Sequence, residues 1–170
     1  MAKMKSILKK LAIAIAVILV LIQFYRPARN LSNDNTNAIS KKFPLPDSVE
    51  TILKASCYDC HSNSTVYPWY ANIQPVSGWL ANHINEGKQH LNFSEFAAYK
   101  VNRQYKVIQG ISKSIKEDEM PLESYTLIHT YAKLSPAQSA TLISWADGIA
   151  ANIRANNPAD SLIYKRPKRD

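Results

Sequence analysis

The chain has 170 residues and a formal net charge of +8. The positive excess lies in about the first thirty residues and in the last few, whereas the stretch from Lys41 to Asp160 carries equal numbers of acidic and basic side chains. A neutral body with charged ends lacks the basic face of a nucleic-acid-binding domain, which excludes that class of partner. We expect the basic C-terminal tail, residues 156–170, to be solvated.

An apolar segment lies near the N-terminus, at residues 7–25, and only Lys9, Lys10 and Gln23 interrupt it. At about 1.5 Å per helical residue it spans roughly 28 Å, close to the hydrocarbon thickness of a bilayer. Lysines at positions 3, 5, 9 and 10 mark its start, so the positive-inside rule keeps residues 1–6 cytoplasmic. The sequence predicts one transmembrane helix, with the rest of the chain exported.

A cleaved signal peptide is the competing interpretation of this segment. Residues Gln23 to Pro27 stand where a small-x-small cleavage site would be expected, so we favour an uncleaved anchor. Either form sends the remaining chain across the membrane. The expected location is the bacterial inner membrane, crossed once, with the folded domain on the periplasmic side.

Residues 26–42 are predicted to form a flexible tether, because Leu31 to Ala38 is rich in Asn, Ser, Thr and Asp and has little to bury. Residues 43–155 suffice for one compact domain. Helix signals are good and alternating strand patterns are missing, so we expect an all-α domain of four or five helices behind the transmembrane helix. The helix signals are capping residues at Asp47 with Glu50, at Ser94, and at Ser135 with Gln138, and a further helix through His83 with Gly87 and Asn92 as breakers.

Both cysteines of the chain lie in one pentapeptide, Cys57-Tyr58-Asp59-Cys60-His61. On a helical turn, residues i, i+3 and i+4 share a face, so Cys57 and Cys60 can each form a thioether to a haem vinyl group while His61 reaches the iron as proximal ligand. The motif predicts one covalently attached haem c per chain. Three rival interpretations use the same residues: a structural disulfide, a thioredoxin-like dithiol, and a zinc half-site completed by His83, His90 or His129.

The second axial ligand of such a haem is predicted to be Met120. Met1 and Met4 precede the apolar segment, so Met120 carries the one thioether of the exported part. Pro121 disfavours helix at Met120 and predicts a loop there. His129 is the alternative ligand, followed by His83, His90 or an open position.

Aromatic side chains follow the motif closely in sequence. Trp69, Tyr70 and Trp79 are predicted to pack against the haem, and ordinary core packing is the other interpretation. A backbone carbonyl of Pro68 or Pro75 is the expected acceptor for the Nδ1 proton of His61.

Six segments occur in an order that resembles the bacterial haem-binding domain family: Cys57–Thr65, Tyr67–Tyr70, Pro75–Leu80, His83–Gly87, Leu91–Phe96 and Glu119–Leu122. The resemblance covers roughly residues 43–153. It implies a membrane-anchored, single-haem, cytochrome c-like helical domain. It also implies that Cys57, Cys60 and His61 attach the haem and that Met120 occupies the distal position.

These patterns favour a membrane-anchored monohaem c-type cytochrome domain that transfers single electrons in the cell envelope. Its expected partners are the cytochrome c maturation machinery and redox proteins that the sequence does not identify. The alternatives are a haem-based sensor or peroxidase-like protein with a displaceable sixth ligand and a non-haem dithiol or zinc module. No Ser-His-Asp arrangement, Gly-rich phosphate loop or paired-carboxylate site stands out, so we assign no catalytic residue and expect a carrier rather than an enzyme.

Overall fold

A computed structural model describes residues 2–164, so the charged end of the predicted basic tail, residues 165–170, lies outside the described residues. Within the described range the chain forms seven α-helices and no β-strand, apart from one isolated bridge between Leu31 and Ser64, and this confirms the all-α prediction. The helices are α1 (Ala2–Leu21), α2 (Asp47–Ser56), α3 (Tyr58–His61), α4 (Val76–His90), α5 (Val101–Lys116), α6 (Glu123–Thr126) and α7 (Pro136–Ala155). Helices α3 and α6 are single turns, which leaves four longer helices beyond α1.

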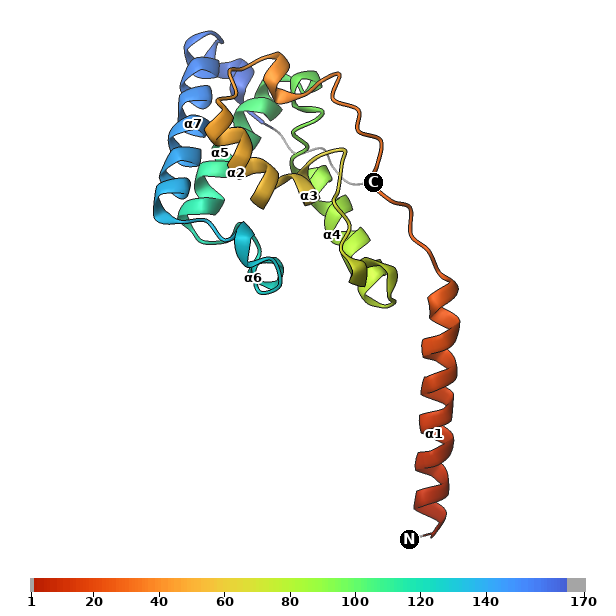
Figure 1. Ribbon diagram of the computed structural model, residues 1–170. Helices are drawn as coiled ribbons and strands as arrows, with labels where there is room; N and C mark the ends of the chain where they lie inside the picture. Colours follow the sequence, from red (N-terminus) through yellow and green to blue (C-terminus); the bar gives the residue numbers. More distant parts are fainter. Residues whose placement is uncertain (1, 165–170) are drawn as a thin grey trace.

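Helix α1 projects away from the rest of the protein (Figure 1). A short 3-10 turn, Ile22–Phe24, extends it, and the stretch Lys3–Phe24 is long and apolar enough to cross a membrane. None of that apolar stretch is buried inside the protein. A helix that leaves its apolar side chains uncovered has the character of a signal sequence or a membrane anchor. It begins at Ala2, several residues before the predicted start at residue 7.

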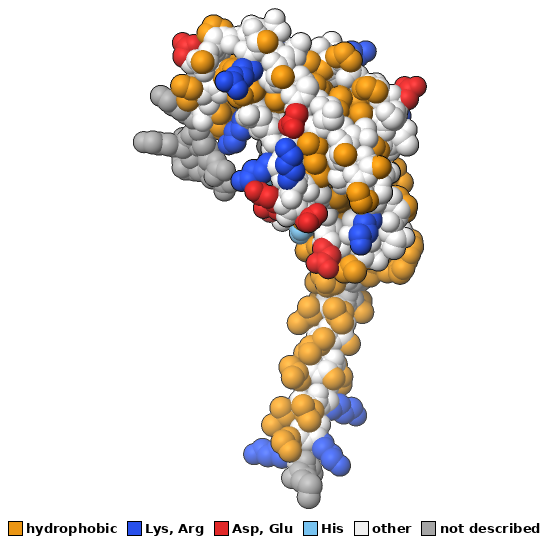
Figure 2. Space-filling view, turned by 90° about the vertical axis from the view of Figure 1, so that its left-hand side faces the viewer, with side chains coloured by type: hydrophobic (Ala, Val, Ile, Leu, Met, Phe, Trp, Pro, Cys, Tyr) orange, Lys and Arg blue, Asp and Glu red, His pale blue; other side chains and the backbone are white. Residues whose placement is uncertain are grey.

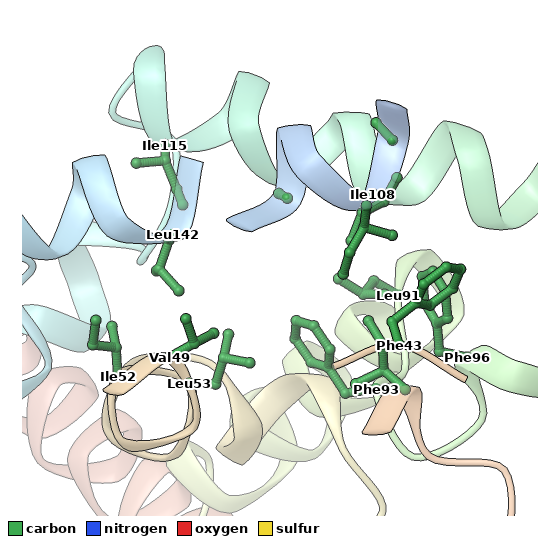
Figure 3. Close-up of a cluster of buried hydrophobic side chains, with 14 of the residues drawn as sticks. Phe43, Val49, Ile52, Leu53, Leu91, Phe93, Phe96, Ile108, Ile115 and Leu142 are labelled. Atoms are coloured by element: carbon green, nitrogen blue, oxygen red, sulfur yellow. The ribbon is translucent and has the colours of Figure 1, made fainter. Parts of the chain in front are cut away.

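The core lies between α2, α5 and α7. Helices α5 and α7 run antiparallel beside each other (Figure 1). Figure 3 shows Ile115 and Leu142 facing Val49, Ile52 and Leu53. Burying each such side chain stabilises the fold by about 1.5–3 kcal/mol. The segment between α4 and α5 completes the core with Leu91, Phe93 and Phe96.

One of the three predicted helix caps is present as predicted. Ser135 and Gln138 form a reciprocal capping box at the start of α7, with Pro136 at the first helical position. Asp47 is instead the first residue of α2, and no side chain caps that helix. Ser94 starts no long helix, because its hydroxyl donates to Asn35 Oδ1 and accepts from the Asn63 N–H; α5 begins only at Val101.

The segment 26–42, predicted as a flexible tether, is built into the domain. Ile39 is fully buried in the core, and its N–H donates to the Phe93 carbonyl at 2.9 Å. Nearer the membrane helix, Asn30 donates from its side chain to the Ser62 carbonyl and to Thr65 Oγ1. The prediction of a tether was wrong because the polar side chains of this segment find partners on the chain that follows the cysteine motif.

Candidate functional site

The cysteine motif lies where one helix ends and another begins. Helix α2 ends at Ser56, and the Cys57 N–H still donates to the Leu53 carbonyl at 2.9 Å. The chain then turns, and the Cys57 carbonyl accepts hydrogen bonds from the N–H groups of Cys60 and His61, which closes α3 as a single turn. Residues 57, 60 and 61 therefore share one helical turn, as predicted from their spacing.

A cavity of about 800 Å³ opens beside this turn, and Cys57, Cys60 and His61 all line it. Its volume is at the upper end of the range found for cofactor and ligand sites. One wall is a face of α5 formed by Arg103, Lys106, Val107, Gly110, Ile111 and Ser114, which are spaced three and four residues apart. Apolar atoms make up most of the lining surface, and the charged side chains of Asp59, Glu86, Arg103 and Lys106 also line the cavity.

The imidazole of His61 is held from behind by the backbone. Its Nδ1 lies 2.9 Å from the Leu91 carbonyl oxygen, which can only accept, so the proton sits on Nδ1 and the lone pair is on Nε2. The prediction that Pro68 or Pro75 accepts the Nδ1 proton of His61 was wrong, because the accepting carbonyl belongs to Leu91 at the end of α4. Burial lowers the pKa of His61, so the ring is neutral and its Nε2 is a competent metal ligand.

Two glycines on α4 and α5 shape the cavity in opposite ways. A Cβ on Gly87 would lie 2.6 Å from the Cys60 carbonyl oxygen, so only glycine lets α4 approach α3 this closely. Gly87 was expected to break the helix, yet it lies inside α4 for this reason. A Cβ on Gly110, by contrast, would have no atom within 4 Å, because that position faces open space in the cavity.

Burial raises the pKa of the Cys57 thiol to about 12 and that of Cys60 to about 11. A thioredoxin-like dithiol needs the opposite shift, toward a thiolate at neutral pH. Both cysteines are free thiols, and no group of three or more His, Cys, Asp or Glu side chains in residues 2–164 is arranged to hold a metal ion. The donor set, two neutral thiols and one neutral imidazole on a mostly apolar cavity, fits a covalently held haem better than a dithiol or a zinc site.

Met120 lines the same cavity, in the loop between α5 and α6. Its N–H bonds to the Ser114 carbonyl, which fastens the loop to the end of α5, and its side chain is 38% exposed. His83 and His90 also line the cavity, from α4. His129 does not, because its two ring nitrogens lie 2.6 Å from the Tyr70 hydroxyl and 2.9 Å from the Tyr131 hydroxyl.

The aromatic residues predicted to pack on a haem do not line the cavity. Trp69 is 76% exposed and Trp79 is 48% exposed, and the half-buried Tyr70 bonds to His129. The chain after the motif leads through the 3-10 turn Trp69–Asn72 toward the end of α1, away from α5. Closeness in sequence does not bring these three side chains into the cavity lining; Tyr70 packs instead, together with Cys60, against a small cluster formed by Ala71, Leu80 and Ile84.

Arg103, Lys106 and Tyr125 line the cavity although no sequence pattern assigned them to the site. Arg103 and Lys106 bring positive charge to the α5 wall, where the guanidinium of Arg103 also stacks on Tyr99 at 4.0 Å. Tyr125, at the start of α6, lines the cavity and donates to Asp59 Oδ2 at 2.7 Å. The spacing of Arg103 and Lys106 from the small residues Gly110 and Ser114, in steps of three and four, could have placed them on one face of a helix. No sequence pattern pairs Tyr125 with Asp59.

The comparison with protein families agrees with this geometry. A family model described as a haem-binding domain matches residues 17–148, which include the cysteine motif, the α5 wall and the Met120 loop. The chain therefore belongs to the haem-binding domain family. No curated protein and no solved structure matches it.

Proposed function

We propose that this member of the haem-binding domain family is a membrane-anchored monohaem c-type cytochrome domain that transfers single electrons in the cell envelope. The observation that carries the proposal is the convergence of Cys57, Cys60, His61 and Met120 on one cavity. Two thiols and an imidazole on one turn are the donor set of covalent haem attachment. A bound haem would supply one-electron chemistry at its iron.

Each cavity residue has a defined task in this proposal. Cys57 and Cys60 would hold the porphyrin through thioethers, and His61, kept in the Nδ1–H tautomer by the Leu91 carbonyl, would bind the iron through Nε2. Arg103 and Lys106 would be the cationic partners for the propionates, since charge-assisted bonds to carboxylates are the stronger kind. Met120 would supply the second protein ligand to the iron, a choice that favours electron transfer over gas binding.

The membrane anchor is α1, left uncleaved, with the domain on the periplasmic side of a bacterial inner membrane. The uncovered apolar surface of α1 and the lysines at its start support this orientation. Partners that follow from the proposal are the cytochrome c maturation machinery, which would form the thioethers, and redox proteins at the same membrane. Nucleic acid is not a partner.

Covalent attachment is tested on protein made in a host competent for cytochrome c maturation. We expect haem to stay with the denatured polypeptide during acidic organic extraction and to be visible by haem staining after denaturing electrophoresis. Cys57→Ser and Cys60→Ser should each weaken the stain, and the double substitution should abolish it. Haem that separates completely from the wild-type chain would rule out the thioether claim and leave a non-covalent site.

The distal ligand is tested by comparing Met120→Ala with His129→Ala. Only Met120→Ala should abolish the near-infrared sulfur-to-iron band of the oxidised protein, because His129 lies outside the cavity on Tyr70 and Tyr131. A spectrum unchanged by Met120→Ala, with ready binding of CO or peroxide by the wild type, would favour the sensor or peroxidase-like alternative.

A further inference from the structure

The end of α1 is clamped to one loop of the domain. Gln23 and the backbone of Gln74 exchange two hydrogen bonds at 3.0 and 3.1 Å, and the Gln74 side chain donates to the Tyr25 carbonyl at 2.8 Å. Arg26 donates to the carbonyl of Asn72 at 2.7 Å, and Arg29 donates to its side chain. Gln74 is itself buried. The loop at residues 72–74 is therefore fixed at the level where the apolar helix ends.

Large apolar side chains stand uncovered on both sides of this loop. Trp69 precedes it in the 3-10 turn, Ile73 lies within it, and Val76 and Trp79 follow on the first turns of α4; all four are exposed. In Figure 2 hydrophobic atoms line the lower edge of the domain near the top of α1, with a few acidic and basic side chains beside them. Monomeric soluble proteins seldom leave such a group of side chains open to water without a function.

The α6 segment adds a second group to the same edge. Leu127 and Ile128 are 72% and 64% exposed. The next residue, His129, lies 2.6 Å from the Tyr70 hydroxyl, and the Tyr70 ring packs edge-on against Trp69 at 5.9 Å, so the two groups are joined. Figure 1 shows α6 and the start of α4 at the edge of the domain that is level with the outer end of α1. We call Trp69, Ile73, Val76, Trp79, Leu127 and Ile128 the underside patch.

We propose that the underside patch rests in the interfacial layer of the same bilayer that α1 crosses, so that the haem domain lies on the membrane surface. This inference rests on the proposed membrane anchor. The hydrogen bonds at residues 72–74 hold the underside patch close to the end of α1. Because α1 ends at the membrane surface, the patch lies next to the lipid headgroups, which therefore cover it in preference to a soluble partner. Tryptophan and tyrosine rings are favoured at this level, because they combine an apolar body with a hydrogen-bonding tip.

The test uses the full haem-loaded chain in lipid nanodiscs, with the photoreactive residue benzoylphenylalanine placed at one position at a time. Positions 69 and 128 report on the underside patch and lie outside the cavity lining. Position 151, exposed on the C-terminal half of α7 away from α1, is the matched control (Figure 1). Position 15, in the middle of α1, reports on the anchor itself. Mass spectrometry identifies lipid adducts after illumination.

We expect lipid adducts at positions 15, 69 and 128 and none above background at position 151. Adducts at position 15 without adducts at 69 and 128 would overturn the surface contact while leaving the anchor in place. Absence of lipid adducts at position 15 would refute the anchor as well. Cross-links from positions 69 or 128 to a second copy of the chain, in place of lipid, would overturn the inference in favour of a dimer contact.

Discussion

The sharpest single test of the packing around the cysteine motif is Gly87→Ala. Replacing glycine by alanine in a helix interior ordinarily stabilises the helix by about 0.5–1 kcal/mol. At position 87, however, the added Cβ would lie 2.6 Å from the Cys60 carbonyl oxygen and 3.2 Å from the Cys60 Cβ. These are backbone-linked atoms, so the contact is relieved only if α4 and α3 move apart by several tenths of an ångström.

The expected cost follows from these two opposing effects. Forcing extra atoms into a tight contact costs about 1–3 kcal/mol, and the gain in helix propensity offsets part of it. We expect a net loss of about 1 kcal/mol in the free energy of unfolding, which lowers Tm by roughly 4 °C for a domain of this size. The displacement of Cys60 should also reduce the haem content of purified protein.

Gly148→Ala is the matched control, since Gly148 lies inside α7 and a Cβ there would have no atom within 4 Å. It should raise the stability by about 0.5 kcal/mol through helix propensity alone. Thermal unfolding followed by circular dichroism, with haem content measured in parallel, compares the two variants. If Gly87→Ala proves as stable and as haem-loaded as Gly148→Ala, the close approach of α4 to the motif is not real.

Three further outcomes are expected. Gly110→Leu should project a side chain into the cavity and lower the haem-to-protein ratio, whereas Gly110→Ala should be tolerated, because a Cβ there meets no neighbour within 4 Å. Equal haem content in both variants would contradict the proposed haem position. Tyr125→Phe removes a hydrogen bond to a carboxylate and should lower stability by about 1.5 kcal/mol in denaturant titrations. Burial and Asp59 raise the pKa of Tyr125 above its ordinary 10.0. The stability that the hydrogen bond contributes is therefore complete below pH 10 and is lost as the pH rises toward the folded-state pKa. A stability difference between wild type and Tyr125→Phe that grows above pH 10 would refute this direction. Leu142→Ala, at a fully buried position, should cost about 2–5 kcal/mol in the same titrations, and a cost under about 1 kcal/mol would mean that the core is not packed as described.

The sequence by itself determined the local geometry of the cysteine motif. Cys57, Cys60 and His61 occupy one helical turn, so hydrogen bonds within that turn are enough to bring the three side chains to one face. The apolar character of α1 and the capping box of α7 are equally local, since each depends on contiguous residues and not on a distant partner. Met120 was singled out from the sequence because it is the one methionine after α1 and precedes a proline, and the structure places it in the cavity lining.

Only the tertiary structure decided which distant residues meet. The carbonyl oxygen that faces His61 Nδ1 belongs to Leu91, and the cations of the cavity wall, Arg103 and Lys106, come from α5. Asp59 pairs with Tyr125 across 66 positions. Trp69, Tyr70 and Trp79 lie outside the cavity lining, and Ile39 was missed as a core residue, for the same reason. A turn or a helix end fixes the direction of the following chain through contacts that no local pattern encodes, so nearness along the chain does not predict nearness in space.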